Sequence, residues 1–319
     1  MTIRALVAAY LGGSESEILA AARKAPKTYR RYLKPKRSGV GMREIFHPSK
    51  DTKALQYALL EIVLPSLPVH ETAAGYIRGL RSPLLRNAQI HSGFSFTVRL
   101  DFRDFFPSIM PEDLLSRLGA VDEWAQIDKK DREFLSDTLF IDFRHRRFLA
   151  IGAPTSPAIS NAVMFELDSR LQASATEHNG RYTRYADDIL YSTNEKGGCQ
   201  AFAGRVGAEI AAMDSPDLAL NEDKTLYMSR GTRRSVTGLI VTPEGNVSVG
   251  RSRKRYLRGL VFRYGKYLAG RGEFDEELTD TLRGLLAFAL DVEPEFFNRL
   301  AQRYGAKVVN AALHGVRTE

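Results

Sequence analysis

The chain has 319 residues, of which 44% are hydrophobic and 26% are charged, a composition that excludes a globally disordered protein and fits roughly two domains. The 46 Lys and Arg residues outnumber the 38 Asp and Glu residues, and the net charge of +8 favours an anionic partner, with nucleic acid ahead of a membrane surface. A lone cysteine, Cys199, excludes an intrachain disulfide and a cysteine-based zinc site, and the lack of a signal peptide or long apolar run leads us to expect a cytoplasmic protein without a membrane partner.

The positive charge is concentrated in two segments. Residues 23–53 carry eleven basic side chains against two acidic ones, and residues 230–271 carry eleven against one. Residues 101–137, between them, are net acidic. This distribution suits a protein that grips a phosphate backbone at its edges and holds cations at its centre, although each basic segment is also compatible with a solvated helix face.

The predicted elements alternate between helices and strands. Apolar spacing predicts a helix over 51–64, alternation predicts a strand over 96–102, and a second helix is expected over 157–173. Residues 182–193 read as two strands around a turn at Ala186-Asp187-Asp188, and strands at 236–241 and 246–249 read as a further hairpin. Helices follow over 251–268, 276–290 and 295–304. The chain is therefore expected to have an α+β core and a helical C-terminal region.

Three carboxylates stand out from this pattern. Asp101 ends the strand at 96–102, and Asp187 and Asp188 occupy the hairpin turn. Phosphoryl transfer to a hydroxyl needs carboxylates that hold two Mg²⁺ ions, one for the attacking hydroxyl and one for the leaving pyrophosphate. An isolated Asp-Asp pair is more often a solvated turn, so the case for a metal site rests on all three acids and their order.

Taken in order, the motifs resemble those of reverse transcriptases over about residues 36–250. The resemblance rests on Asp101 with Phe105-Phe106, on the segment from Gly152 to Asn161, on Tyr185-Ala186-Asp187-Asp188, and on Lys224. Two further stretches are similar to signatures of the bacterial retron branch, namely Asn87-Ala88-Gln89-Ile90-His91 and Val236-Thr237-Gly238. The length also fits that branch better than the longer group II intron enzymes.

The resemblance implies an α+β right-hand polymerase fold. Fingers and palm would interleave over 1–249, with an antiparallel palm sheet carrying the catalytic aspartates, and 250–319 would form a helical thumb. Asp101, Asp187 and Asp188 would bind two Mg²⁺ ions, or Mn²⁺ in their place, and Lys224 would protonate pyrophosphate or be an ordinary surface lysine. The nucleotide would contact Arg43, Phe105, Phe106 as the sugar gate, and Gly152. Ile151 replaces a common Gln, and Asp104 is either a turn-shaping residue or a contact to triphosphate and water.

The resemblance also implies partners. These are dNTP substrates, a structured noncoding RNA, the DNA copied from it after priming at an internal 2′-hydroxyl, and an accessory effector in anti-phage defence. RNA contacts are expected from the two retron signatures, through Asn87, His91, Val236, Thr237 and Gly238, and from the basic segment near the C-terminus, through Arg253, Arg255, Arg258 and Arg263. The alternatives are another small bacterial reverse transcriptase, of the diversity-generating or abortive-infection type, and a non-catalytic RNA-binding scaffold.

Overall fold

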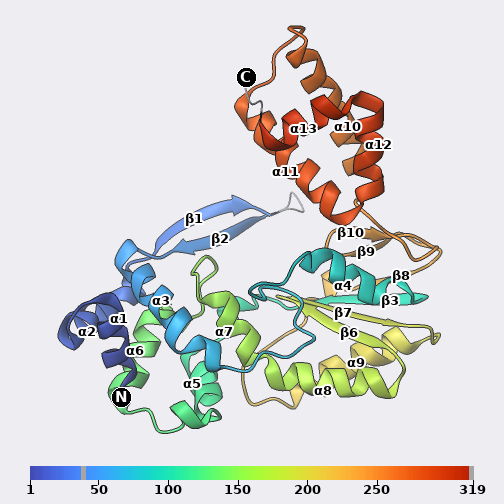
Figure 1. Ribbon diagram of the computed structural model, residues 1–319. Helices are drawn as coiled ribbons and strands as arrows, with labels where there is room; N and C mark the ends of the chain where they lie inside the picture. The colour runs from blue at the N-terminus through green and yellow to red at the C-terminus, as the bar shows by residue number, and fades with distance from the viewer. Residues whose placement is uncertain (37–40, 316–319) are drawn as a thin grey trace. The chain divides into compact units, whose positions relative to one another are not determined.

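The computed structural model describes residues 1–36 and 41–315 (Figure 1). The chain forms two compact units. The first contains residues 1–78, 98–191 and 197–226, and the second contains residues 79–97, 192–196 and 227–319. Within the described residues, no helix combines the length and the apolar character needed to cross a membrane.

The first unit begins with a helical subdomain. Its helices are α1 (Ile3–Leu11), α2 (Glu15–Lys24), α3 (Lys50–Ile62), α5 (Pro111–Gly119) and α6 (Lys129–Leu139), with short 3₁₀ turns η1 (Ala25–Lys27), η2 (Leu64–Ser66) and η4 (Asp122–Trp124). Arg4 of α1 joins three of these segments, because its guanidinium pairs with Glu15 at 3.1 Å, Asp128 at 2.8 Å and Asp131 at 3.0 Å. Ser14 caps α2 with a capping box, which satisfies the exposed N–H groups of its first turn.

Two antiparallel hairpins extend from this subdomain. The first is β1 (Arg30–Pro35) with β2 (Met42–His47), and the second is β4 (Ile141–Phe143) with β5 (Arg146–Phe148). One apolar cluster holds the two hairpins together, because Phe46 of the first hairpin packs with Ile141 and Phe148 of the second. The hairpin β1–β2 lies in the basic segment 23–53, so this part of the segment is a pair of strands and not the helix face that was one of its two interpretations.

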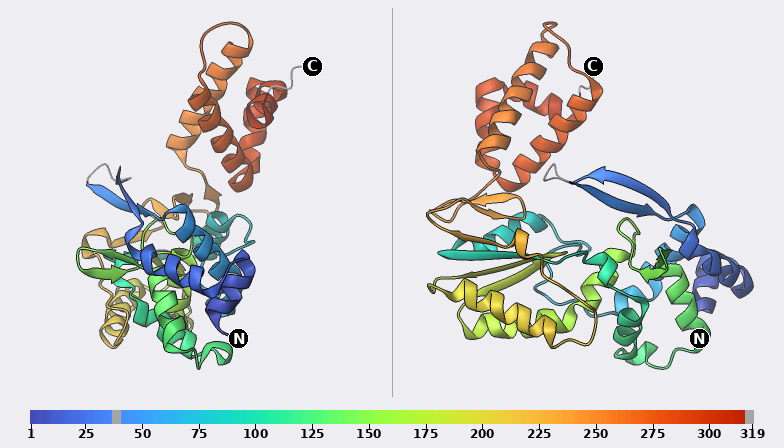
Figure 2. Two further views of the ribbon diagram at one scale, coloured as in Figure 1. Left: turned by 90° about the vertical axis from the view of Figure 1, so that its left-hand side faces the viewer. Right: turned by 180° about the vertical axis from the view of Figure 1, so that it is seen from behind.

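A four-stranded sheet carries the site. Its order is β6-β7-β3-β8, formed by β6 (Arg181–Tyr185), β7 (Asp188–Thr193), β3 (Phe96–Asp101) and β8 (Leu226–Ser229). Helices α8 (Phe165–Glu177) and α9 (Gly198–Ala211) lie side by side, and α8 packs on β6 (Figure 2). The first unit also holds α7 (Ser156–Val163) and the turns η3 (Phe106–Ser108) and η5 (Glu222–Lys224).

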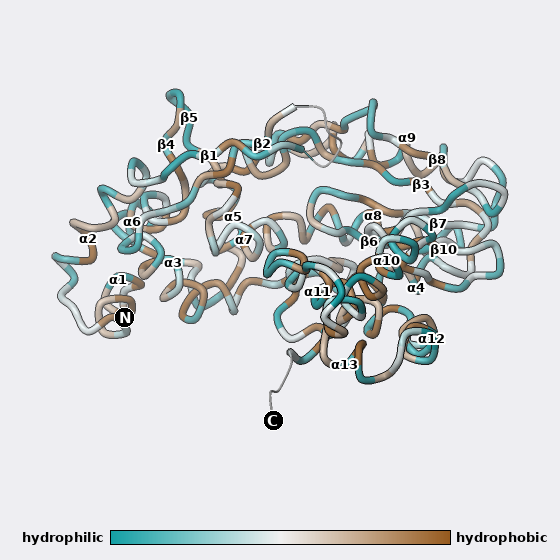
Figure 3. Tube along the Cα trace, turned by 90° about the horizontal axis from the view of Figure 1, so that it is seen from above, coloured by the Kyte–Doolittle hydropathy of each residue, from teal (hydrophilic) through white to brown (hydrophobic). Residues whose placement is uncertain are grey.

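The second unit combines a small sheet with helices. It contains α4 (Pro83–Ser92), the antiparallel sheet β9 (Arg234–Val236), β10 (Leu239–Val241) and β11 (Val247–Ser248), and the helices α10 (Arg251–Leu268), α11 (Glu276–Val292), α12 (Pro294–Tyr304) and α13 (Ala306–His314). Helix α4 packs against all three strands. Stretches of hydrophilic and hydrophobic residues alternate along the chain, as expected when each helix buries one face (Figure 3).

The α+β class is confirmed, and two local expectations are corrected. The helix expected over 157–173 is two helices, because Met164 departs from helical geometry with ψ of −2°, a break that no Gly or Pro marks. The strand expected over 236–241 is two strands, because Thr237 and Gly238, with φ of 47° and 82°, form a tight hairpin turn. The second compact unit groups the strands β9–β11 and helix α4 with the C-terminal helices. The division into fingers and palm over 1–249 and a thumb over 250–319 stays a prediction.

Candidate nucleotide and metal site

The two strand ends that carry the aspartates are joined through the backbone. Phe102 N donates to Asp187 O at 3.1 Å, which fixes the residue after Asp101 beside the hairpin turn. Asn221 N donates to Asp101 O at 2.8 Å and brings the segment before Lys224 to the same place. Ala186 adopts a left-handed φ of 57°, so the chain reverses sharply and Asp188 begins the next strand. The structure therefore brings together the three acids that the sequence singles out.

Burial and mutual repulsion disfavour the charged form of the carboxylates Asp187 and Asp188. Burial raises the pKa of Asp188 to about 6, and the neighbouring charge of Asp187 adds to this effect while Arg99 opposes it. Burial also raises the pKa of Asp187, with a further contribution from the charge of Asp101. Arg99 Nε lies 4.0 Å from Asp188 Oδ1 and supplies only partial compensation. A bound cation would relieve the repulsion among these groups.

The donor chemistry fits magnesium. Carboxylate oxygens are the hard ligands that Mg²⁺ prefers, and the ion is commonly held by one or two carboxylates together with water and substrate phosphates. In the described part of the chain, no three Asp, Glu, His or Cys side chains are grouped closely enough to hold an ion by themselves. A site built from these aspartates is therefore one that water and nucleotide phosphate would complete.

Lys224 lies within this cluster. Its ammonium donates to Asp101 Oδ1 at 2.6 Å, and its side chain is half exposed while that of Asp101 is buried. The turn η5 holds Lys224 through a hydrogen bond from its backbone N to Asn221 O at 3.0 Å. In this arrangement the lysine charge stabilises Asp101 and lies at the edge of the cavity beside it.

A cavity of about 650 Å³ opens in front of Asp187. Within the first unit it is lined by Arg43 from β2, by the segment Phe102–Pro107, by residues of the hairpin β4–β5 and by Ile151, Asn221 and Lys224. It therefore combines one carboxylate of the cluster with several cations, as a site for a nucleoside triphosphate requires. The expected nucleotide contact Arg43 lies on this wall.

The aromatic pair after Asp101 divides into two environments. Phe105 is buried and stacks on Phe102 with ring centroids 5.5 Å apart. Phe106 is only half-buried, meets the Phe105 ring edge-on at 5.4 Å and lines the cavity. Of the two aromatic candidates, Phe106 therefore lies where it could contact a sugar, and Phe105 supports it from behind.

Gly152 has a structural reason to be glycine. It adopts a φ of 111°, and a Cβ there would lie 2.8 Å from Phe46 O and from a side-chain carbon of Ile45. The adjoining Ile151 O accepts from Phe46 N at 2.7 Å, so this loop is fastened to β2. The apolar residue Ile151 also lines the cavity.

Asp104 shapes the turn through its backbone. It adopts a left-handed φ of 45°, and its carbonyl accepts from Ser108 N at 2.9 Å and from Ser108 Oγ at 3.1 Å. Its side chain is exposed and lines the cavity. The position is compatible with both roles considered from the sequence.

A buried polar network lies behind the turn at Ala186-Asp187-Asp188 and was not predicted from the sequence. Arg184 and Asp168 are both fully buried, and two hydrogen bonds of 2.9 and 2.7 Å join the guanidinium to the carboxylate. Tyr182 OH donates to the same carboxylate at 2.6 Å. Arg184 Nη1 donates to Ala186 O at 3.1 Å and to Asn161 Oδ1 at 3.2 Å. The network therefore holds Ala186, the residue that precedes Asp187.

Tyr76 is a second unforeseen residue of the cavity. It adopts a left-handed φ of 62° although it is not glycine, and its ring centroid lies 6.2 Å from that of Tyr185. Asn161 Nδ2 donates to Gly75 O at 2.9 Å, which fixes the preceding peptide. Burial and the nearby charge of Asp187 raise the pKa of the Tyr76 phenol.

The first retron signature lies in the interior. Asn87 and His91 of α4 are both 0% exposed, and His91 Nδ1 lies 2.9 Å from Ser192 Oγ. Burial lowers the pKa of His91 to about 3, so its imidazole is neutral at physiological pH. The expectation of a direct RNA contact is at odds with this burial, which instead suits a part in holding α4 in place.

The second retron signature is a hairpin turn. Val236 is buried, Thr237 Oγ1 donates to Leu84 O at 3.2 Å, and Gly238 is exposed. The turn is therefore fastened to the start of α4, and only its tip is open to a ligand.

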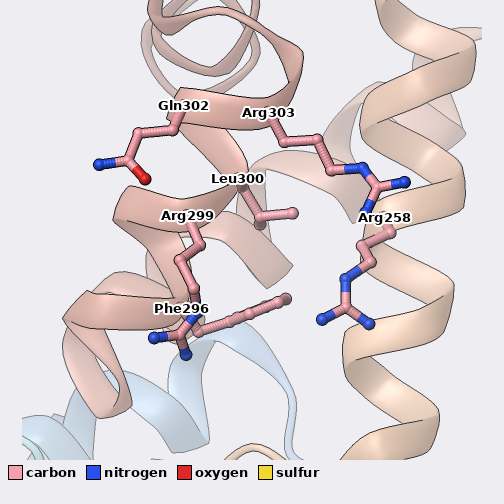
Figure 4. Close-up of a pocket in the computed structure, with 6 residues that line it drawn as sticks. All are labelled: Arg258, Phe296, Arg299, Leu300, Gln302 and Arg303. Carbon is pink, nitrogen blue, oxygen red and sulfur yellow. The ribbon is translucent and has the colours of Figure 1, made fainter.

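The arginines of α10 differ in their availability. Arg253 is half-buried and donates to Val249 O at 3.0 Å, whereas Arg255 is exposed. Arg258 and Arg263 are exposed, with guanidinium carbons 5.3 Å from the centre of the Phe296 ring and 5.8 Å from that of Phe274. Figure 4 shows Arg258 of α10 facing a cleft of about 380 Å³ lined by α12 residues that include Arg299 and Arg303.

Comparisons with known proteins agree with the geometry. The family described as reverse transcriptase (RNA-dependent DNA polymerase) matches residues 34–251. The chain is 32% identical over 287 residues to the retron Ec83 reverse transcriptase of Escherichia coli, covering 89% of each chain. It is 32% identical over 302 residues to the retron Ec73 reverse transcriptase of the same species, covering 92% of this chain and 90% of the relative.

The fold also resembles that of a solved polymerase. An apo telomerase from Candida tropicalis superposes with a TM-score of 0.51 at 12% identity, covering 90% of this chain and 60% of the telomerase. At that identity the likeness concerns the fold alone. It agrees with the α+β right-hand polymerase class.

The chain belongs to the reverse transcriptase family, whose members polymerise DNA on an RNA template. Within that family it is of the retron type, because the relatives that match most of its length are retron reverse transcriptases.

Proposed function

We propose that this retron-type reverse transcriptase copies a structured noncoding RNA into single-stranded DNA that stays linked to the RNA. Priming would start from an internal 2′-hydroxyl of that RNA, and the product would act with an accessory effector in anti-phage defence. The observation that carries the catalytic part is the meeting of Asp101, Asp187 and Asp188 beside a cavity of nucleotide size.

In this proposal Asp101, Asp187 and Asp188 hold two Mg²⁺ ions, and Mn²⁺ is a chemical substitute. Bound there, the ions would lower the pKa of the attacking hydroxyl and neutralise charge on the leaving pyrophosphate. The chain's own residues supply position and selectivity. Arg43 would bind the triphosphate with its guanidinium fork, because that geometry suits phosphate oxygens.

Lys224 would stabilise Asp101 before the substrate binds and face the pyrophosphate afterwards. Its half-exposed ammonium at the cavity edge supports this second role. Phe106 would exclude ribonucleotides, since its half-buried ring lines the same cavity while Phe105 packs behind it. Gly152 would let its loop approach β2 closely enough to complete the cavity wall.

Choice of the RNA would come from outside the catalytic centre. Arg255, Arg258 and Arg263 are exposed on α10 beside Tyr256 and Phe262, each 51% exposed. Exposed aromatic rings can stack on unpaired bases while arginines bind phosphate, a combination common in RNA recognition. Arg253, held by backbone carbonyls, and the tip at Gly238 would flank this surface.

The test is to express the gene with its flanking DNA and to analyse the nucleic acid that copurifies with the protein. The proposal predicts a single-stranded DNA joined to RNA, whose mobility changes after ribonuclease treatment and after cleavage of a 2′–5′ branch. DNA that has no covalent link to RNA would contradict 2′-hydroxyl priming. It would favour another type of small bacterial reverse transcriptase.

A further inference from the structure

The hairpin β4–β5 ends in a turn that its sequence does not favour. Arg144 and His145 form the two-residue turn with φ of 51° and 61°. Such turns are ordinarily made by Asn and Gly, because a left-handed backbone is sterically costly for residues with a larger side chain. Strained turns of this kind are concentrated at functional sites. In Figure 3 the tip of this hairpin is hydrophilic.

The rest of the hairpin is firmly anchored. Arg147 donates to both carboxylate oxygens of Asp142, at 2.7 and 2.9 Å, and to Asp137 at 2.7 Å. Ile141 and Phe148 belong to the apolar cluster around Phe46. The strained turn is thus held by the packing beneath it.

The cations around the tip outnumber the one acid beside them, because Asp142 pairs with Arg147 and is also attracted by Lys27. A pocket of about 410 Å³ is lined by Lys27, Asp142 and the run Arg144–Arg147. Its one acid, Asp142, is already engaged by Arg147. Across residues 1–36 and 41–315, no carboxylate lies within ion-pair distance of Lys27, Arg144 or Arg146. Such a cluster of arginines and lysine is complementary to phosphate.

The pocket adjoins the nucleotide cavity. Arg144 and Arg146 line both spaces, so the hairpin tip separates them. The inner space contains Asp187, whereas the outer one has no carboxylate that is free to hold a metal ion. The outer pocket therefore suits a phosphate that is bound by side chains alone, as in a nucleic-acid backbone, and not a metal-bound triphosphate.

We infer that this pocket binds the phosphodiester backbone of the single-stranded template that has not yet been copied. This inference rests on the proposed function, because a template strand that pairs in the inner cavity must continue over a neighbouring surface. Arg144, Arg146 and Lys27 contact phosphates and read no base, which suits an enzyme that must copy every nucleotide of its template.

The experiment compares two substrates that share one primer duplex. In one the RNA template ends a single nucleotide beyond the primer, and in the other it continues as a long single-stranded extension. Binding is measured by fluorescence anisotropy over a range of salt concentrations. The variant is Arg144→Gly with Arg146→Gln, because glycine suits the left-handed turn and glutamine preserves the strand. The charge-matched control is Lys129→Gln with Lys130→Gln, two exposed residues of α6 that line neither space.

The inference predicts that the extension tightens binding by the wild type and the control, and that the variant loses this gain by roughly tenfold or more. The slope of log affinity against log salt should fall by about 1.4 for two lost phosphate contacts on a single strand. Arg144→Lys with Arg146→Lys should retain most of the gain. Equal weakening on both substrates, or an unchanged variant, would overturn the inference.

The nucleotide-addition rate on the short substrate separates this inference from the proposed function. A variant that raises the dNTP KM on that substrate but binds the extension normally would assign these arginines to the triphosphate and refute the template site. Failure of the wild type to add a nucleotide would count against the proposed function, while the binding comparison would still decide the inference.

Discussion

The buried pair of Asp168 and Arg184 gives a prediction in which stability and catalysis can be separated. Replacing Asp168 with Asn keeps the shape of the side chain and removes its charge. The Arg184 guanidinium then stays fully buried with no compensating carboxylate. Breaking a buried pair in this way costs about 3–5 kcal/mol, a large part of the ~5–15 kcal/mol that stabilises a typical protein.

The assay is denaturant unfolding of Asp168→Asn beside a surface control. Glu61→Gln breaks the exposed pair of Glu61 and Arg78, joined at 2.9 Å, and should cost less than about 1 kcal/mol. A triple variant tests the second role. Asp168→Leu, Tyr182→Phe and Arg184→Met together replace the polar groups with apolar ones of similar size, which should restore much of the stability.

The triple variant should nonetheless extend a primer slowly, with kcat lowered more than the dNTP KM is raised. The reason is that Ala186 O loses the 3.1 Å hydrogen bond from Arg184 that fixes the turn before Asp187. Wild-type kcat in a stable triple variant would refute the positioning role. A loss below about 1 kcal/mol in Asp168→Asn would refute the reasoning on burial.

Three further predictions concern the sugar gate, the acid pair and RNA choice. Phe106→Ala should admit ribonucleotides, measured as the ratio of rNTP to dNTP incorporation, and unchanged discrimination would remove Phe106 from this role. Asp188→Asn should stabilise the metal-free protein above about pH 6. The pKa of Asp188 is 3.8 in the unfolded chain and about 6 in the folded protein, so the wild type loses stability as pH rises between these two values. The difference in melting temperature should vanish below about pH 4, and a difference independent of pH would contradict the assigned cause. Changing Arg255, Arg258 and Arg263 to Ala should abolish branched-DNA synthesis on the native RNA but reduce extension of an ordinary annealed primer much less. Equal loss of both activities would indicate a generic grip on nucleic acid.

Local patterns predicted the strands at whose ends the three aspartates lie. The apolar alternation that ends at Asp101 and the aromatic strands around Ala186-Asp187-Asp188 each specify a strand and its end. Both signals are local, since alternation and turn chemistry act within a few residues. The order of the motifs then indicated the family, and the comparisons confirmed it.

What the sequence did not predict depends on contacts between distant segments. Every residue of β1 is exposed, so this strand has no apolar alternation to reveal it. The partner of Arg184 lies sixteen residues away on another element, and nothing near Asp168 marks it as buried. Asn87 and His91 were expected to contact RNA because they lie in a retron signature, yet both are buried in α4. Tyr76 lines the cavity because its backbone is left-handed, a conformation that the sequence around it did not lead us to predict.

The most direct test of the central claim is primer extension by the variant in which Asp187 and Asp188 are both replaced with Asn. The assay contains Mg²⁺, dNTPs and a primed RNA template, and binding of the same RNA is measured in parallel. DNA synthesis should disappear while RNA binding stays close to that of the wild type, because the exposed arginines of α10 are untouched. A double variant that extends the primer at the wild-type rate would contradict the claim that these carboxylates hold the catalytic metal ions.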